Sequence, residues 1–214
     1  MNSRSVLALS AGALCAVFLG SLLERRAATL IATDRALAGI ALGIVLPVFA
    51  YGVWTATTGS RSLRDAVWVH ARHGGSRRQL GTGLMLVNTA IAAAFGALLA
   101  AVAVVVTRFP ADPELARDLF TSSWIGALGG ACYSLLFALG SSFGGGGGAR
   151  LALLAGDWLL GAGTGALALP WPRAHIRNLL GGSPAAMLPQ FGATLMLLAL
   201  ALFFTLWTLR RTDP

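Results

Sequence analysis

The sequence predicts an all-α, polytopic membrane protein that forms one domain over residues 1–214, with six transmembrane helices. Composition is the first indication: 56% of the residues are hydrophobic and only 11% are charged, with a mean hydropathy of +0.74. A soluble domain carries about 25% charged residues. The second indication is a series of apolar stretches, each with the roughly 20 residues that a helix needs to cross a bilayer. We place the six spans at about 5–23, 36–58, 81–107, 119–142, 151–169 and 186–209.

The first span follows a single arginine, as the apolar region of a signal peptide does. It is followed by Glu24-Arg25-Arg26, and an A-x-A-like cleavage site is missing from the expected place. The apolar run is also long enough to cross a bilayer. The sequence therefore favours an uncleaved first helix over a signal peptide.

The second span contains Pro47 near its middle. Proline has no backbone N–H, and a helix in lipid tolerates it where neighbouring helices or local adjustments satisfy the freed carbonyl. Sharp kinks in helices commonly lie at proline. Pro47 is therefore a candidate hinge, and a static packing kink is the alternative.

Glycines at GxxxG spacing occur in the second, fourth and fifth spans. Small residues at positions i and i+4 let two helix backbones approach closely. We expect close packing there, either against another helix of this chain or against a second subunit. In a chain so rich in glycine and alanine, a chance match is the alternative for each pair. The pairs are Gly39/Gly43, Gly126/Gly130 and Gly161/Gly165.

Arginine is the only basic residue type, with 16 arginines against 8 acidic residues and a net charge of +8. Without lysine the sequence excludes a Walker A loop and Schiff-base chemistry. The high hydropathy indicates that this positive charge serves a membrane protein rather than a protein that binds nucleic acid. With six spans, nine arginines fall on the side of the two termini and seven on the other. Because basic loops remain in the cytoplasm, we expect both termini there, with the chain in the plasma (cell inner) membrane.

The loop 59–80 holds five of those nine arginines. Within it, residues 62–72 have apolar side chains at helical spacing and charged ones mostly opposite, which predicts a short amphipathic helix. Gly74-Gly75 ends it, and Ser76 is a candidate N-cap for the helix that begins at Arg77. Two readings remain open. The helix lies on anionic lipid, or it docks a cytoplasmic partner.

The loop 170–185 also has helical content. Pro170-Trp171-Pro172 ends the fifth span, and Gly181-Gly182-Ser183-Pro184 precedes the sixth. The apolar positions between them predict a weakly amphipathic turn or two on the outer side. A plain connecting loop is the alternative.

The sequence predicts no catalytic, cofactor-binding or metal site. His70, His73 and His175 all lie in loops, and none belongs to the set of three or four ligands that zinc needs. Aspartyl intramembrane proteolysis needs two aspartates within spans, and only Asp157 qualifies. A carboxylate inside a membrane is a functional candidate by default. We interpret Asp157 as a polar link between helices. The alternatives are that it lies along a substrate path or takes part in a proton relay.

The whole arrangement resembles the membrane-spanning (permease) subunits of ABC-2-type ABC transporters. The resemblance covers the chain as architecture: six spans in about 210 residues and the basic segment 71–80, Ala-Arg-His-Gly-Gly-Ser-Arg-Arg-Gln-Leu, leading into the third span. The Gly144–Gly148 turn and the Gly/Pro-broken loop before the sixth span add to it. One departure is that only Met1 to Arg4 precede the first span, where the family often has an amphipathic helix. This favours a divergent or accessory subunit.

The resemblance implies that the first cytoplasmic loop forms a coupling helix for a separate ATP-binding cassette ATPase subunit. ATP hydrolysis would then belong to that partner, so the chain itself would be no enzyme. A second membrane subunit, identical or different, would pair with it, the direction would be export, and 172–183 would supply an outer-leaflet helical element. The implied docking residues are Arg61, Arg64, Asp65, Trp68, Arg72, Arg77 and Arg78.

The alternative function is a non-transporting membrane scaffold or an accessory subunit of a membrane complex. Copurification of an ATPase distinguishes the two. The sequence does not identify the substrate.

Overall fold

The computed structural model describes residues 3–27, 32–59, 61–71, 76–109, 114–144 and 147–212. All regular structure in these ranges is helical, which confirms the predicted all-α class. The long segments are α1 (Ser3–Arg26), the continuous run of α2 (Ala32–Asp34), η1 (Arg35–Val45) and α3 (Leu46–Thr58), then α5 (Arg77–Thr107), α6 (Leu115–Ser142) and α9 (Gln190–Thr212). The short ones are α4 (Leu63–Ala71), α7 (Gly148–Leu160), η2 (Ala166–Ala168), α8 (Pro172–Leu179) and η3 (Ala185–Met187).

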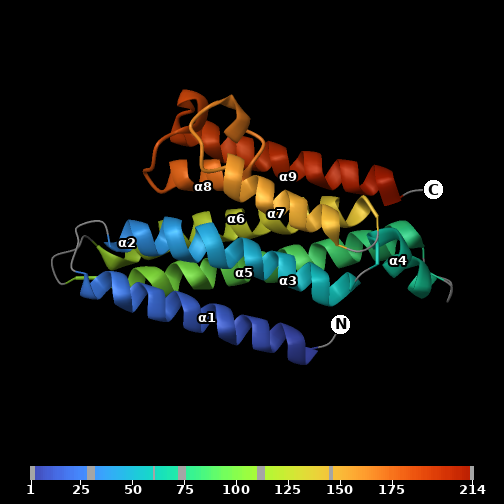
Figure 1. The fold of residues 1–214 in the computed structure, drawn as a ribbon, viewed down its shortest axis with the longest axis horizontal. Helices are drawn as coiled ribbons and strands as arrows, with labels where there is room; N and C mark the ends of the chain where they lie inside the picture. The colour runs from blue at the N-terminus through green and yellow to red at the C-terminus, as the bar shows by residue number, and fades with distance from the viewer. Residues whose placement is uncertain are drawn as a thin grey trace.

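The long helices lie side by side along the long axis of the molecule (Figure 1). The start of α1, the end of α9 and the short helix α4 lie at one end of this bundle, and α2 and α8 lie at the other. α6 is the most buried long helix, whereas α1 is peripheral and mostly exposed. The outer helices are exposed on the surface of the bundle and its centre is packed. This arrangement is what a polytopic membrane protein requires.

Five helical segments in the described part of the chain are long and apolar enough to cross a membrane. They are Ser5–Arg26, Ala32–Thr58, Arg77–Thr107, Leu115–Ser142 and Gln190–Thr212. The predicted fifth span, 151–169, is not one helix, because α7 has 13 residues and ends at Leu160. At 1.5 Å per residue it is about 20 Å long, short of a bilayer core. The count of six spanning helices is therefore not confirmed.

Glycine explains why α7 ends early. The segment after Leu160 reads Gly161-Ala162-Gly163-Thr164-Gly165, and glycine is a poor helix former. The last helical bond runs from the Gly161 N–H to the Asp157 carbonyl. Hydropathy alone did not detect this end, because the residues that follow remain apolar.

The second span changes its helical form just before Pro47. Residues Arg35–Val45 form a π-helix, and the Leu46 N–H donates to the Ala41 carbonyl, a five-residue step. The α-helical hydrogen-bonding pattern begins at Leu46, with Pro47 buried in its first turn. π-helices are usually single turns at functional sites, so eleven residues of π-helix are unusual. The predicted irregularity at Pro47 is thus a π-to-α transition, and its role as a hinge remains a prediction.

α5 and α6 approach each other at glycine. A Cβ atom added at Gly126 would overlap with the carbonyl oxygen of Gly96, and one added at Gly130 would overlap with that of Ala92. Of the three predicted glycine pairs, Gly126/Gly130 therefore packs against a helix of the same chain. An added Cβ at Gly39 or Gly165 meets no atom within 4 Å.

The segment between α7 and α9 folds into a small hairpin around α8. Its helix confirms the predicted helical content of the loop 170–185. His175 is buried, its Nε2–H donates to the Leu169 carbonyl at 2.7 Å, and burial lowers the pKa of the imidazole. Arg177 donates to the carbonyls of Ala162, Gly163 and Ser183 and so holds the end of α7 to the hairpin.

Candidate partner-docking site

The short helix α4 begins with a reciprocal cap. The Asp65 N–H donates to Ser62 Oγ at 3.1 Å, and Ser62 Oγ donates to Asp65 Oδ2 at 2.6 Å. Ser62 is therefore the N-cap of α4, and its hydroxyl satisfies a backbone donor that a helix start otherwise leaves free. On the inner side, Leu63 and Val67 are 0% and 6% exposed and pack in the main core. The predicted amphipathic helix is therefore present, with its apolar side turned into the bundle against α5 and α6.

The predicted docking residues lie mainly on the outer side of α4 and at the start of α5. Trp68 is 40% exposed. Arg72 lies outside the described residues. Arg77 is half-buried. The exposed side chains are those of Arg61, Arg64, Asp65, Trp68 and Arg78. The structure thus brings the predicted docking residues that it describes to one end of the bundle, where α4 lies (Figure 1).

A buried arginine holds the chain just before α4. Arg150, at the start of α7, is 2% exposed. Its Nη1 donates to Thr58 Oγ1 and its Nη2 to the Gly59 carbonyl, both at 2.7 Å. Hydrogen bonds from a charged group are roughly twice as strong as neutral ones. Because Thr58 and Gly59 end α3, this residue ties α7 to the base of the α4 loop.

Asp157 joins three helices near the other end of α7. It is fully buried, accepts a hydrogen bond from Tyr133 Oη at 2.9 Å, and accepts another from the Arg173 backbone N–H at 3.1 Å. The second donor belongs to the first turn of α8, where a carboxylate is favoured by the helix dipole. The prediction of a polar link is supported. Ser134 is not a partner of Asp157, because its hydroxyl accepts from the Trp54 indole N–H at 3.0 Å.

We expect Asp157→Leu to lower the free energy of unfolding by about 2–4 kcal/mol, because it leaves the buried Tyr133 hydroxyl and the partly buried Arg173 N–H without acceptors. Asp157→Asn should cost less than about 1 kcal/mol, since the amide can accept from Arg173 and donate to Tyr133. Thermal unfolding of the purified protein in detergent measures both. Equal losses for the two variants would contradict the polar-link role. If folded Asp157→Asn loses function, Asp157 acts along a path or in proton transfer.

Sequence reasoning missed Arg150 as an anchor. The residue was counted only as a loop arginine, although it is the single charged residue between positions 143 and 156. An isolated arginine that follows a glycine turn and precedes an apolar run is a weak signal for a buried cation. The partner lies about 90 positions away in the chain, and no local pattern identifies it.

In the part of the chain that the structure describes, no group of three or more histidine, cysteine or acidic side chains is placed to hold a metal ion. Cys15 and Cys132 are free, the first exposed and the second buried. Comparisons with protein-family models, with curated proteins and with solved structures find no match to this chain. The functional argument therefore rests on its own residues.

Proposed function

We propose that this chain is the permease subunit of an ATP-driven, ABC-2-type membrane transporter, and that the ATPase is a separate subunit docked on α4. The observation that supports this most is the orientation of α4. It is a capped helix with a charged outer side, packed against α5 and α6 at one end of the bundle.

The burial of α4 favours docking over a lipid-surface role. A helix that lies on a membrane inserts its apolar face among the lipids. In this chain the apolar side chains Leu63 and Val67 are already buried against the bundle. What α4 presents outward is Arg61, Arg64 and the partly exposed Trp68, and arginine and tryptophan are typical anchors of protein interfaces.

The hydrogen bonds of Arg150 connect the docking helix α4 mechanically to the rest of the bundle. A partner that binds two states of the permease with different affinity shifts the balance between them. Displacement of α4 pulls on Thr58 and Gly59, and Arg150 connects these residues to α7. α7 in turn is bonded through Asp157 to the start of α8. In this proposal both termini and α4 face the cytoplasm, and export is the direction of transport.

The test is a charge reversal on the outer side of α4. We expect Arg61→Glu with Arg64→Glu to weaken binding of the ATPase by about 100-fold, because like charges facing each other cost several kcal/mol. Asp65 is left in place, since it caps α4. The chain is purified after cross-linking in its native membrane, the ATPase is identified by mass spectrometry, and its binding and ATP hydrolysis are measured.

The matched control is Arg26→Glu, an exposed arginine at the opposite end of the bundle. It should leave ATPase binding unchanged. Binding that survives the double reversal would refute α4 as the docking site. If no P-loop ATPase accompanies the wild-type chain, the scaffold function is correct instead.

A further inference from the structure

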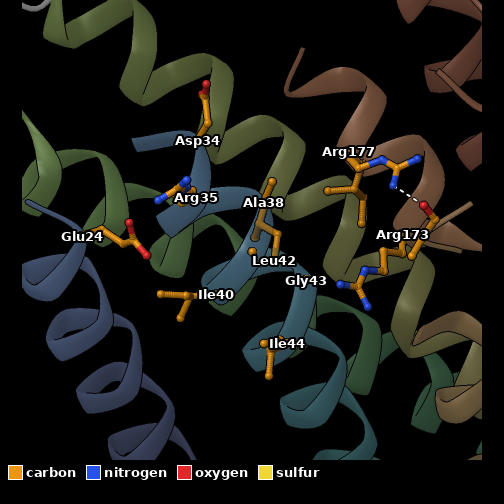
Figure 2. A pocket seen from close by; sticks show the side chains of 13 residues that line it. Glu24, Asp34, Arg35, Ala38, Ile40, Leu42, Gly43, Ile44, Arg173 and Arg177 are labelled. Carbon is orange, nitrogen blue, oxygen red and sulfur yellow. Dashed lines mark hydrogen bonds between the residues drawn. The ribbon is translucent and has the colours of Figure 1, made fainter. Parts of the chain in front are cut away.

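A groove of about 620 Å³ opens between α1, η1 and α8, at the end of the bundle away from α4. Figure 2 shows its charged rim, with Glu24 on α1 and Asp34 and Arg35 at the start of the second span. Deeper in, the groove is bounded by Ile44 of η1 and by Arg173 of α8. It is therefore charged at its mouth, and deeper in it combines the apolar surface of η1 with the guanidinium of Arg173.

Small residues of the π-helix make room in this groove. Gly39 and Gly43 both line it. A Cβ added at Gly39 would have no atom within 4 Å, so this position faces open space. Below the groove the apolar surface continues outward, with Ile44 49% and Val48 37% exposed. An acyl chain can therefore follow this strip while a polar group occupies the groove.

Arg173 is the cation that other groups leave available. Its guanidinium points toward Gly43 and Ile44 (Figure 2), and an added Gly43 Cβ would lie 3.8 Å from its Nη2. Its backbone N–H is used by Asp157, whose carboxylate also attracts the guanidinium electrostatically, but within the described residues the side chain makes no hydrogen bond or ion pair. Arg177, one turn further along α8, is instead held by three carbonyls.

Arg173 lies against a helix that is apolar enough to cross a membrane. Gly43 lies near the middle of the 27-residue segment Ala32–Thr58, well inside the second spanning helix. Arginine at membrane depth is rare, and it pairs with a counter-group or marks a ligand path. Guanidinium matches phosphate in geometry, because its planar N–H groups form two parallel hydrogen bonds.

We propose that this groove binds a phospholipid, with the lipid phosphate on Arg173. The headgroup fills the polar mouth near Arg35 and Glu24, and the acyl chains follow Ile44 and Val48 into the bilayer. The proposal does not depend on an ATPase partner, since it concerns one face of the isolated chain.

Native mass spectrometry of the delipidated, detergent-purified protein tests this directly. Three probes separate the contributions: dioleoylphosphatidylglycerol, dioleoylglycerol with the same chains and no phosphate, and inorganic phosphate without chains. We expect retention of the phospholipid alone. Arg173→Gln should reduce that retention about tenfold through loss of a charged hydrogen bond. Phospholipid retention by Arg173→Lys should lie between that of the wild type and that of Arg173→Gln. The backbone N–H that Asp157 accepts from remains in all of these variants.

A steric variant checks the same site without altering charge. Gly39→Leu places a side chain in the open groove and should also lower phospholipid retention about tenfold or more. Gly12→Leu, at an equally open position on α1, and Arg26→Gln are the matched controls and should retain the lipid. Retention of dioleoylglycerol at the same level, binding of phosphate alone, or full phospholipid retention in Gly39→Leu would overturn the proposal. Should Arg173→Gln fail to fold, Gly39→Leu decides.

Discussion

Gly130→Ala is expected to destabilise the protein by about 3 kcal/mol or more. The new Cβ would overlap with the Ala92 carbonyl oxygen, so α5 and α6 must separate. Overpacking costs about 1–3 kcal/mol where flexible side chains can adjust, and here the obstructing atom belongs to the backbone. α5 and α6 share the most extensive contact of the described elements, so the separation also disturbs their shared core. Thermal unfolding of the purified protein in detergent measures the loss.

Gly83→Ala is the control, in α5, the helix against which Gly130 of α6 packs. A Cβ at Gly83 has no atom within 4 Å, so this substitution creates no overlap. Because alanine is a better helix former than glycine by about 1 kcal/mol, the control should be neutral or slightly stabilising. Opposite signs for Gly130 and Gly83 are the expected pattern. Equal unfolding temperatures for the two variants would mean that α5 and α6 do not approach as described.

Arg150→Met is expected to lower the free energy of unfolding by about 2–3 kcal/mol. Methionine keeps the apolar stem but removes both hydrogen bonds to the end of α3, and the buried hydroxyl of Thr58 then lacks its donor. The loss should be local as well as global. Hydrogen exchange should accelerate over residues 58–71, because α4 is no longer held at its base.

Arg78→Met is the control for this second substitution, since Arg78 is exposed at the start of α5. It should leave both the unfolding temperature and the exchange of α4 within experimental error of the wild type. If Arg150→Met unfolds normally but exchange over 58–71 is unchanged, α7 does not hold the base of α4. The proposed route from α4 to α8 would then lose its first connection.

Several features were accessible from the sequence because they depend on local composition. Five long apolar helices follow from runs of about 20 apolar residues. The amphipathic α4 follows from its 3.6-residue spacing. The exposed position of Arg61 and Arg64 follows from the same spacing.

Other features were not accessible, and each has a physical reason. The early end of α7 at Leu160 depends on glycine, whose effect on helices is small per residue and is hidden by continuing hydropathy. The π-helix over Arg35–Val45 depends on how the second span is packed, since its sequence is compatible with an ordinary α-helix. For the glycine pairs, spacing identified three candidates and only the neighbouring backbone distinguished Gly126/Gly130.

High hydropathy was enough to indicate a membrane chain, because transfer into lipid is a sum over local residues, and the lack of lysine was enough to exclude a Walker A loop. The tertiary structure decided which charged groups are used inside the chain. Arg150 meets Thr58, Asp157 meets Tyr133 and the start of α8, and Arg173 faces an open groove. These pairings join segments far apart in the sequence, and a buried charge selects its partner by proximity in the folded state rather than by any local pattern.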